Sequence, residues 1–189
     1  MAKRRTSKPK YSIATLLVML ILAVLYNYNQ KTQPDSPRKG NDTKEVRALK
    51  TFTGKVTAVK DGDTFEVLYD GQPERVRLAE IDCPEKKQAY GMKAKQYASD
   101  LCFGKIVTVE SGGKRDRYGR VVGTVITQEG INVNEEMIKA GYAWHYKDYS
   151  NNAQLGVYEE QARQQHLGLW AAKRPQAPWE YRRDIRRRK

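Results

Sequence analysis

The sequence predicts an α+β, mainly β fold: a five-stranded Greek-key barrel of the OB type with about three appended helices, preceded by one N-terminal apolar helix. Five short segments alternate apolar and polar residues and are bounded by turn signals, as half-buried strands are. One helical pattern follows the third of these segments, and two more follow the fifth. This order suits a closed OB barrel. Other α+β arrangements fit it as well, because a pattern alone does not show whether the sheet closes.

The strands are separated by short polar turns. Asp61-Gly62-Asp63 interrupts the first apolar pattern, and Asp70-Gly71 is a hairpin signal after the second. The opening of the body is therefore expected to be an antiparallel meander. The expected strands are residues 51–59, residues 64–69, a third strand through Val76, Leu78 and Ile81, residues 105–110 and residues 121–127.

Three helices are expected around the last two strands. Residues 91–101 form a short amphipathic pattern whose apolar positions are Met92, Ala94, Ala98 and Leu101, and Gly104 stops it. Two later patterns each end at a glycine, as helices commonly do. These two helices are expected at residues 133–140 and 154–166.

The N-terminus has the layout of an export signal. Five Lys and Arg residues lie in the first ten positions, and residues 11–30 carry no charge. Since no small-residue cleavage site follows, residues 1–30 are interpreted as an uncleaved signal anchor with a transmembrane segment at about 12–29. The positive-inside rule then predicts a single-pass protein of the cell membrane with an extracytoplasmic body. The alternative is secretion after signal cleavage.

The remaining organisation follows from composition. Residues 31–48 are rich in Pro, Ser, Asn and charged residues and are expected to be a flexible linker. A folded domain is expected at 49–172, and a basic extension at 173–189. The net charge of +13 belongs mostly to the flanks, because residues 49–174 hold 19 Lys and Arg against 17 Asp and Glu. Net charge is therefore weak support for nucleic-acid binding, and the arginines of the last eight residues are interpreted as a solvated tail.

Five residues carry the chemistry of the body. Asp63 and Asp82 offer hard oxygen ligands for a divalent cation, and Glu85 can activate water beside them. Arg77 and Arg120 offer planar guanidinium donors that match phosphate oxygens. Each short motif alone is usually structural, Asp-Gly-Asp being a common turn. Together they supply what phosphodiester hydrolysis needs.

This set, with its spacing, resembles the staphylococcal nuclease (thermonuclease) family over about residues 50–170. The resemblance implies an OB barrel that cuts DNA and RNA with little sequence specificity and leaves 3′-phosphate ends. It implies Ca²⁺ bound by Asp63, Asp82 and the backbone carbonyl of Cys83. The best-known member has Thr at the position of Cys83, but a carbonyl ligand does not depend on its side chain. The implied roles of the other residues are catalysis by Arg77, Glu85 and Arg120, and substrate binding by Arg117, Tyr118 and Tyr146.

Two other functions fit the same chain. One is a noncatalytic OB module that binds nucleic acid or protein, tethered to the membrane, and the other is a membrane-tethered adaptor. A degenerate module loses its acidic and arginine positions, whereas all five are present here. No obligate protein partner is evident, so a monomer is expected. Cys83 and Cys102 could form a disulfide in an oxidising compartment, but strain in a metal-binding loop argues against it.

Overall fold

The computed structural model describes residues 18, 20, 21, 25, 49–113 and 115–188. The chain divides into two units, Met1–Glu45 and Val46–Lys189, and every element below belongs to the second. The four described residues of the first unit are helical and exposed. The other positions of the predicted transmembrane segment 12–29, and the predicted linker 31–48, lie outside the described residues. Among the positions that are described, no helix combines the length and apolar character needed to cross a membrane.

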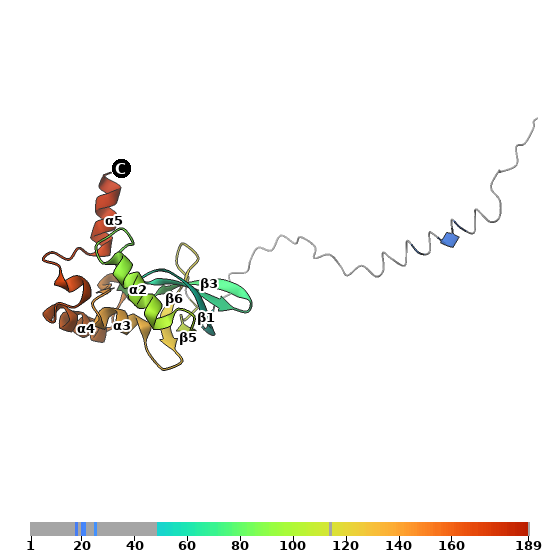
Figure 1. The fold of residues 1–189 in the computed structure, drawn as a ribbon, viewed down its shortest axis with the longest axis horizontal. Helices are drawn as coiled ribbons and strands as arrows, with labels where there is room; N and C mark the ends of the chain where they lie inside the picture. The colour runs from blue at the N-terminus through green and yellow to red at the C-terminus, as the bar shows by residue number, and fades with distance from the viewer. Residues whose placement is uncertain (1–17, 19, 22–24, 26–48, 114, 189) are drawn as a thin grey trace, which may run out of the picture. The chain divides into compact units, whose positions relative to one another are not determined.

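Five strands close into a barrel in the order β1-β2-β3-β6-β5, with β5 pairing back to β1. The predicted five-stranded barrel is therefore confirmed (Figure 1). Every neighbouring pair is antiparallel except β3 and β6, which pair in parallel through Arg77 and Val122 and the residues beside them. The strands are β1 (Thr51–Asp61), β2 (Thr64–Tyr69), β3 (Gln72–Leu78), β5 (Ile106–Glu110) and β6 (Val121–Thr127).

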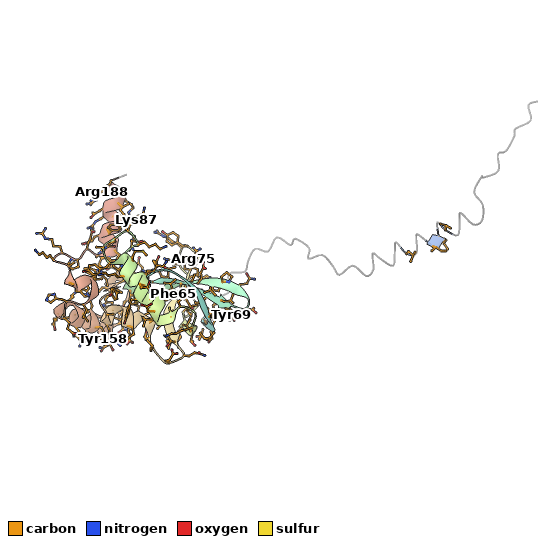
Figure 2. The ribbon with its side chains drawn as sticks, viewed as in Figure 1. Phe65, Tyr69, Arg75, Lys87, Tyr158 and Arg188 are labelled. Atoms are coloured by element: carbon orange, nitrogen blue, oxygen red, sulfur yellow. The ribbon has the colours of Figure 1, made fainter. Side chains whose placement is uncertain are left out.

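The barrel interior is filled by the alternate apolar side chains that predicted the strands. Phe65 is fully buried (Figure 2), and the branched residues Val56, Val76 and Val125 belong to the same core cluster and have no exposed surface. Burial of each such side chain contributes roughly 1.5–3 kcal/mol to the stability of the fold. Because successive side chains of a strand point to opposite faces, the polar partners of these residues lie outside the barrel.

The third predicted strand is shorter than expected. It ends at Leu78, and Ile81 belongs instead to a separate two-residue strand, β4 (Ile81–Asp82), which pairs with β7 (Trp144–His145). The physical reason is Glu80, whose positive φ of 65° turns the chain off the barrel edge. This bend sends Asp82 away from the barrel wall, toward the turn between β1 and β2.

The helices lie around the barrel, with α3 and α4 packed on each other (Figure 1). The first, α2, buries a face of small residues, Gly91, Ala94, Ala98 and Cys102, so it packs closely against β1. Met92 was expected on this face but is 60% exposed. The helices are α2 (Gly91–Cys102), α3 (Val133–Lys139), α4 (Ala153–Gln164) and α5 (Pro178–Arg187), with short 3-10 turns η1 (Lys147–Tyr149) and η2 (Gly168–Ala171).

Helix α5 forms within the segment predicted only as a basic extension. Pro178 occupies its first turn, where a missing backbone N–H costs nothing. Trp179 anchors the helix, since its ring packs edge-on against Trp144 with centroids 5.5 Å apart. The arginines of this region are therefore held on a helix that packs on the body, and Arg188 lies at its far end (Figure 2).

Candidate active site

The turn between β1 and β2 places Asp63 against the segment that follows β4. Gly62 is buried there, and a Cβ at this position would lie 2.8 Å from the Cβ of Cys83. The close approach lets the backbone N–H of Cys83 donate to Asp63 Oδ2 at 3.0 Å. The Thr64 hydroxyl donates to the other oxygen, Oδ1, at 3.1 Å. Both carboxylate oxygens of Asp63 are therefore fixed in place.

Arg77 joins the two predicted metal ligands. One terminal nitrogen, Nη1, lies 3.1 Å from Asp63 Oδ2, and the other, Nη2, lies 3.0 Å from Asp82 Oδ1. Nη1 also donates to the backbone carbonyls of Leu78 and Ile81, at 2.8 and 3.0 Å. These carbonyls flank the bend after β3, so the shape of the bend orients the guanidinium. Arg77 thereby brings the carboxylates of Asp63 and Asp82 side by side.

Arg120 reaches the same cluster from the start of β6. Its Nε and Nη2 contact Asp116 Oδ2, each at 2.7 Å, and Nη1 donates to the Thr64 hydroxyl at 3.2 Å. The other Asp116 oxygen accepts the backbone N–H groups of Tyr118 and Arg120, which closes the turn. Because Thr64 bonds to both Arg120 and Asp63, the two predicted catalytic arginines belong to one hydrogen-bonded network.

Glu85 lies at the start of a compact turn that leads into α2. Its backbone carbonyl accepts the N–H of Gln88 at 2.8 Å, and it packs so closely on Gly91 that a Cβ there would collide with it. The side chain is 41% exposed and can reach water. Its Oε1 accepts a hydrogen bond from Arg182 of α5 at 3.0 Å. The predicted general base is thus near Asp82, with an arginine between them.

The predicted substrate-binding residues lie in different surroundings. Tyr118 is 64% exposed, and its hydroxyl accepts a hydrogen bond from Arg117, whose guanidinium lies 4.8 Å from the ring centroid. Tyr146 is half-buried, and its ring stacks on Trp179 with an interplanar angle of 6° and centroids 5.3 Å apart. Tyr118 is therefore an exposed ring with the guanidinium groups of Arg117 and Arg120 over it, whereas one face of Tyr146 is covered by α5.

Burial is the main influence on the pKa values of the carboxylates in the cluster. Burial and the charge of Asp63 raise the pKa of Asp61 to about 6. Burial also raises the pKa of Asp82, and the bonds from Arg182 and the charge of Arg77 only partly offset it. Burial lowers the pKa of Arg77, but the negative charges of Asp63 and Asp82 outweigh it, so the pKa of Arg77 is raised. Burial thus disfavours the charged form of Asp61 and Asp82, and the paired arginine partly restores it for Asp82.

The donor set fits a hard cation held in an open site. Within the described part of the chain, no group of three or more His, Cys, Asp or Glu side chains is placed to hold a metal ion. The predicted Ca²⁺ ligands are two carboxylates, Asp63 and Asp82, and the backbone carbonyl of Cys83. All three donors are oxygen, which suits Ca²⁺, and its usual 6 to 8 ligands would be completed by water and substrate.

Three site residues were missed by sequence reasoning. Thr64 begins a predicted strand and Asp116 directly precedes Arg117, and both orient Arg120, but a hydroxyl or a turn aspartate carries no sign of that role. The interpretation of Arg182 as part of a solvated tail was wrong, because its guanidinium contacts Asp82 and Glu85. The position of α5 was not readable from the pattern. Cys83 and Cys102 are both buried free thiols, so they form no disulfide here.

Comparison with known proteins gives the family. Residues 75–172 match the family of staphylococcal nuclease homologues. An uncharacterized endonuclease of Escherichia coli is 46% identical over 129 residues, which are 68% of this chain and 84% of that protein. A micrococcal nuclease of Shigella flexneri is 42% identical over 148 residues, covering 73% of this chain and 84% of that protein. An uncharacterized endonuclease of Haemophilus influenzae is 44% identical over 132 residues, which are 69% of this chain and 73% of that protein. The chain therefore belongs to the staphylococcal nuclease family.

Proposed function

We propose that this protein is a Ca²⁺-dependent endonuclease that cuts DNA and RNA with little sequence specificity, acts as a monomer and leaves 3′-phosphate ends. As a member of its family, the chain is a nuclease, a hydrolase that acts on phosphodiester bonds. The observation that carries the proposal is the continuous network that joins the five predicted residues. It runs from Arg120 through Thr64, Asp63, Arg77 and Asp82 to the Arg182 contact with Glu85.

The predicted site residues divide three roles in this reaction among them. Asp63, Asp82 and the carbonyl of Cys83 would hold Ca²⁺, which when bound supplies positive charge to the phosphate oxygens. Glu85 accepts a proton from the attacking water, and its partial exposure lets that water approach. Arg77 and Arg120 donate hydrogen bonds to the phosphoryl oxygens as negative charge builds on them. Displacement of the 5′ oxygen, which takes up a proton, leaves the phosphate on the 3′ side.

The metal requirement is tested on the purified full-length chain in a mild nonionic detergent. We expect single-stranded DNA and RNA labelled at the 5′ end to be cut with Ca²⁺ and left intact with excess chelator. Phosphatase should shift the labelled products, because they would carry a 3′-phosphate. Asp82→Asn is expected to need much more Ca²⁺, since one charged ligand is lost. Equal cleavage by the wild type with Ca²⁺ and with chelator would contradict the proposal.

We also propose that residues 12–29 anchor the protein in the cell membrane, with the body on the extracytoplasmic side. The support is the cationic N-terminus before an uncharged segment. In bacterial cells, the protein is expected in the membrane fraction after an alkaline wash, and protease added to spheroplasts should digest the body. A chain without residues 1–30 should stay in the cytoplasm. A soluble extracytoplasmic protein that begins after residue 25 would instead indicate a cleaved signal.

A further inference from the structure

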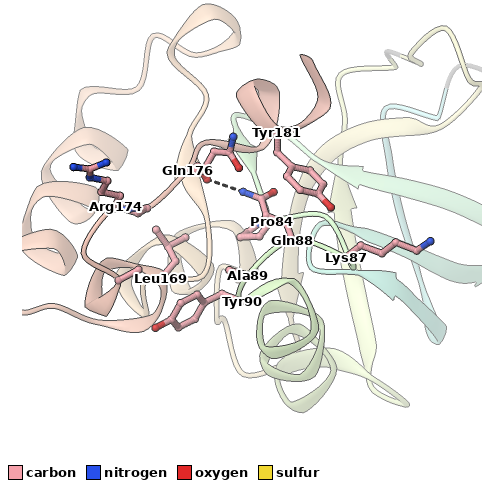
Figure 3. Close-up of a pocket in the computed structure, with 11 residues that line it drawn as sticks. Pro84, Lys87, Gln88, Ala89, Tyr90, Leu169, Arg174, Gln176 and Tyr181 are labelled. Carbon is pink, nitrogen blue, oxygen red and sulfur yellow. Dashed lines mark hydrogen bonds between the residues drawn. The ribbon is translucent and has the colours of Figure 1, made fainter. Parts of the chain in front are cut away.

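Helix α5 is fastened beside the active site at two points. On one side, Trp179 stacks on Tyr146 and packs edge-on against Trp144. On the other side, the carbonyl of Gln176, just before the helix, accepts a hydrogen bond from Gln88 at 2.7 Å (Figure 3). Gln88 belongs to the same turn as Glu85. The helix is therefore held by contacts other than those of Arg182.

This placement directs Arg182 onto the predicted metal ligand and the predicted base together. Its Nη2 donates to Asp82 Oδ2 at 2.7 Å, and its Nη1 donates to Asp82 Oδ1 at 3.2 Å. The same Nη1 donates to Glu85 Oε1 at 3.0 Å. A two-pronged contact of this kind between guanidinium and carboxylate is among the stronger hydrogen-bonded ion pairs. The Asp82 side chain is only 2% exposed, whereas that of Arg182 is 37% exposed, so solvent screens the pair from one side only.

The contact conflicts with the proposed use of both carboxylates. Asp82 Oδ1 also accepts from Arg77, so three N–H donors already share the two oxygens of Asp82. A carboxylate offers about four acceptor positions, so a cation would have to share Asp82 with both Arg77 and Arg182. A divalent cation bound here would also repel the guanidinium of Arg182 at short range. Glu85, for its part, has one of its two carboxylate oxygens, Oε1, occupied by the same guanidinium.

We propose that α5 is an autoinhibitory helix: Arg182 competes with the divalent cation for Asp82 and occupies Oε1 of Glu85. Cation binding and release of Arg182 are then coupled, each favouring the other by the same factor. Trp179 takes part by holding the helix in place and by covering one face of Tyr146. This inference rests on the proposed Ca²⁺-dependent function and adds a means by which that site is kept closed.

The test is isothermal titration of the full-length chain with Ca²⁺ in the absence of nucleic acid. Removal of the competing guanidinium by Arg182→Gln is expected to tighten Ca²⁺ binding about 5- to 50-fold, within the usual range of coupled sites. Arg186→Gln is the matched control. It removes the same charge from an exposed position of α5, and it should change the affinity less than twofold.

A second variant separates release of the helix from a local change of charge. Trp179→Ala keeps Arg182 but removes the packing on Tyr146 and Trp144, so Ca²⁺ should again bind more tightly. Hydrogen exchange supplies a readout without any variant, because saturating Ca²⁺ should speed exchange of the α5 amides. Ca²⁺-dependent cleavage with unchanged or weaker Ca²⁺ affinity in both variants would overturn the autoinhibitory role and leave the nuclease proposal intact. Cleavage by the wild type that needs no Ca²⁺ would overturn both.

Discussion

Replacement of Arg120 by Lys is expected to lower kcat about 10³-fold, equivalent to about 4 kcal/mol, while substrate binding weakens less than about tenfold. Asp116 holds the Nε and Nη2 side of Arg120, which aims the rest of the guanidinium toward the cluster at Thr64. Lysine keeps the charge but cannot contact Asp116, Thr64 and a phosphate through one planar group. Charge that builds in the transition state should therefore lose more stabilisation than the bound substrate.

The measurement combines single-turnover cleavage of labelled DNA with fluorescence anisotropy. Binding is measured in a Glu85→Gln background, so that cleavage does not interfere. Arg75→Lys serves as the control, because Arg75 is an exposed residue two positions from Arg77 on β3. It should leave both quantities unchanged. Equal losses of turnover and binding in Arg120→Lys would show that Arg120 only holds the substrate.

The second large effect is expected for Glu85→Gln, with kcat lowered roughly 10²- to 10⁴-fold. The amide has nearly the shape of the carboxylate and can still accept the hydrogen bond from Arg182, but it cannot take a proton from water. Because Glu85 is not among the proposed ligands, the affinity for Ca²⁺ should not fall. Single-turnover rates and Ca²⁺ titration of the same preparation test both statements.

Glu160→Gln is the matched control for this variant. Glu160 is exposed on α4, where its side chain accepts a hydrogen bond from Gln164 of the same helix. Its replacement should leave kcat unchanged. Full activity in Glu85→Gln would remove Glu85 from the mechanism. A large loss of Ca²⁺ affinity would instead make it a metal ligand.

The barrel could be predicted because its signals are local. Alternation of buried residues such as Phe65 and Val67 depends only on the period of a strand, and the turns are marked by Gly and Asp. The separate pairing of Ile81–Asp82 with Trp144–His145 could not be predicted, because it depends on a positive φ at Glu80 and on a partner strand far along the chain. Closure of the barrel likewise depends on pairing between distant strands.

The candidate site was predictable to the extent that residue type and spacing express its chemistry. The structure brings Asp63, Arg77, Asp82 and Arg120 into one network, whereas their roles stay predictions. Arg182 was missed because it is one of several neighbouring arginines. The rotation of α5 about its own axis decides which of these arginines faces Asp82, and the packing of Trp179 sets that rotation. Packing of this kind is a tertiary property that a charge pattern does not encode.

The parallel pairing of β3 and β6 ties folding to activity. Arg77 is one of only three β3 residues in that pairing, and Arg120 directly precedes the β6 residues that complete it. A slip of one residue would turn Arg77 to the opposite face of the sheet and shift Arg120 along the strand. The hydrogen bonds between β3 and β6 therefore help to close the barrel and also set the spacing of Arg77 and Arg120. Turnover is therefore a sensitive reporter of correct strand register, and a misregistered chain would lose activity even if it stayed compact.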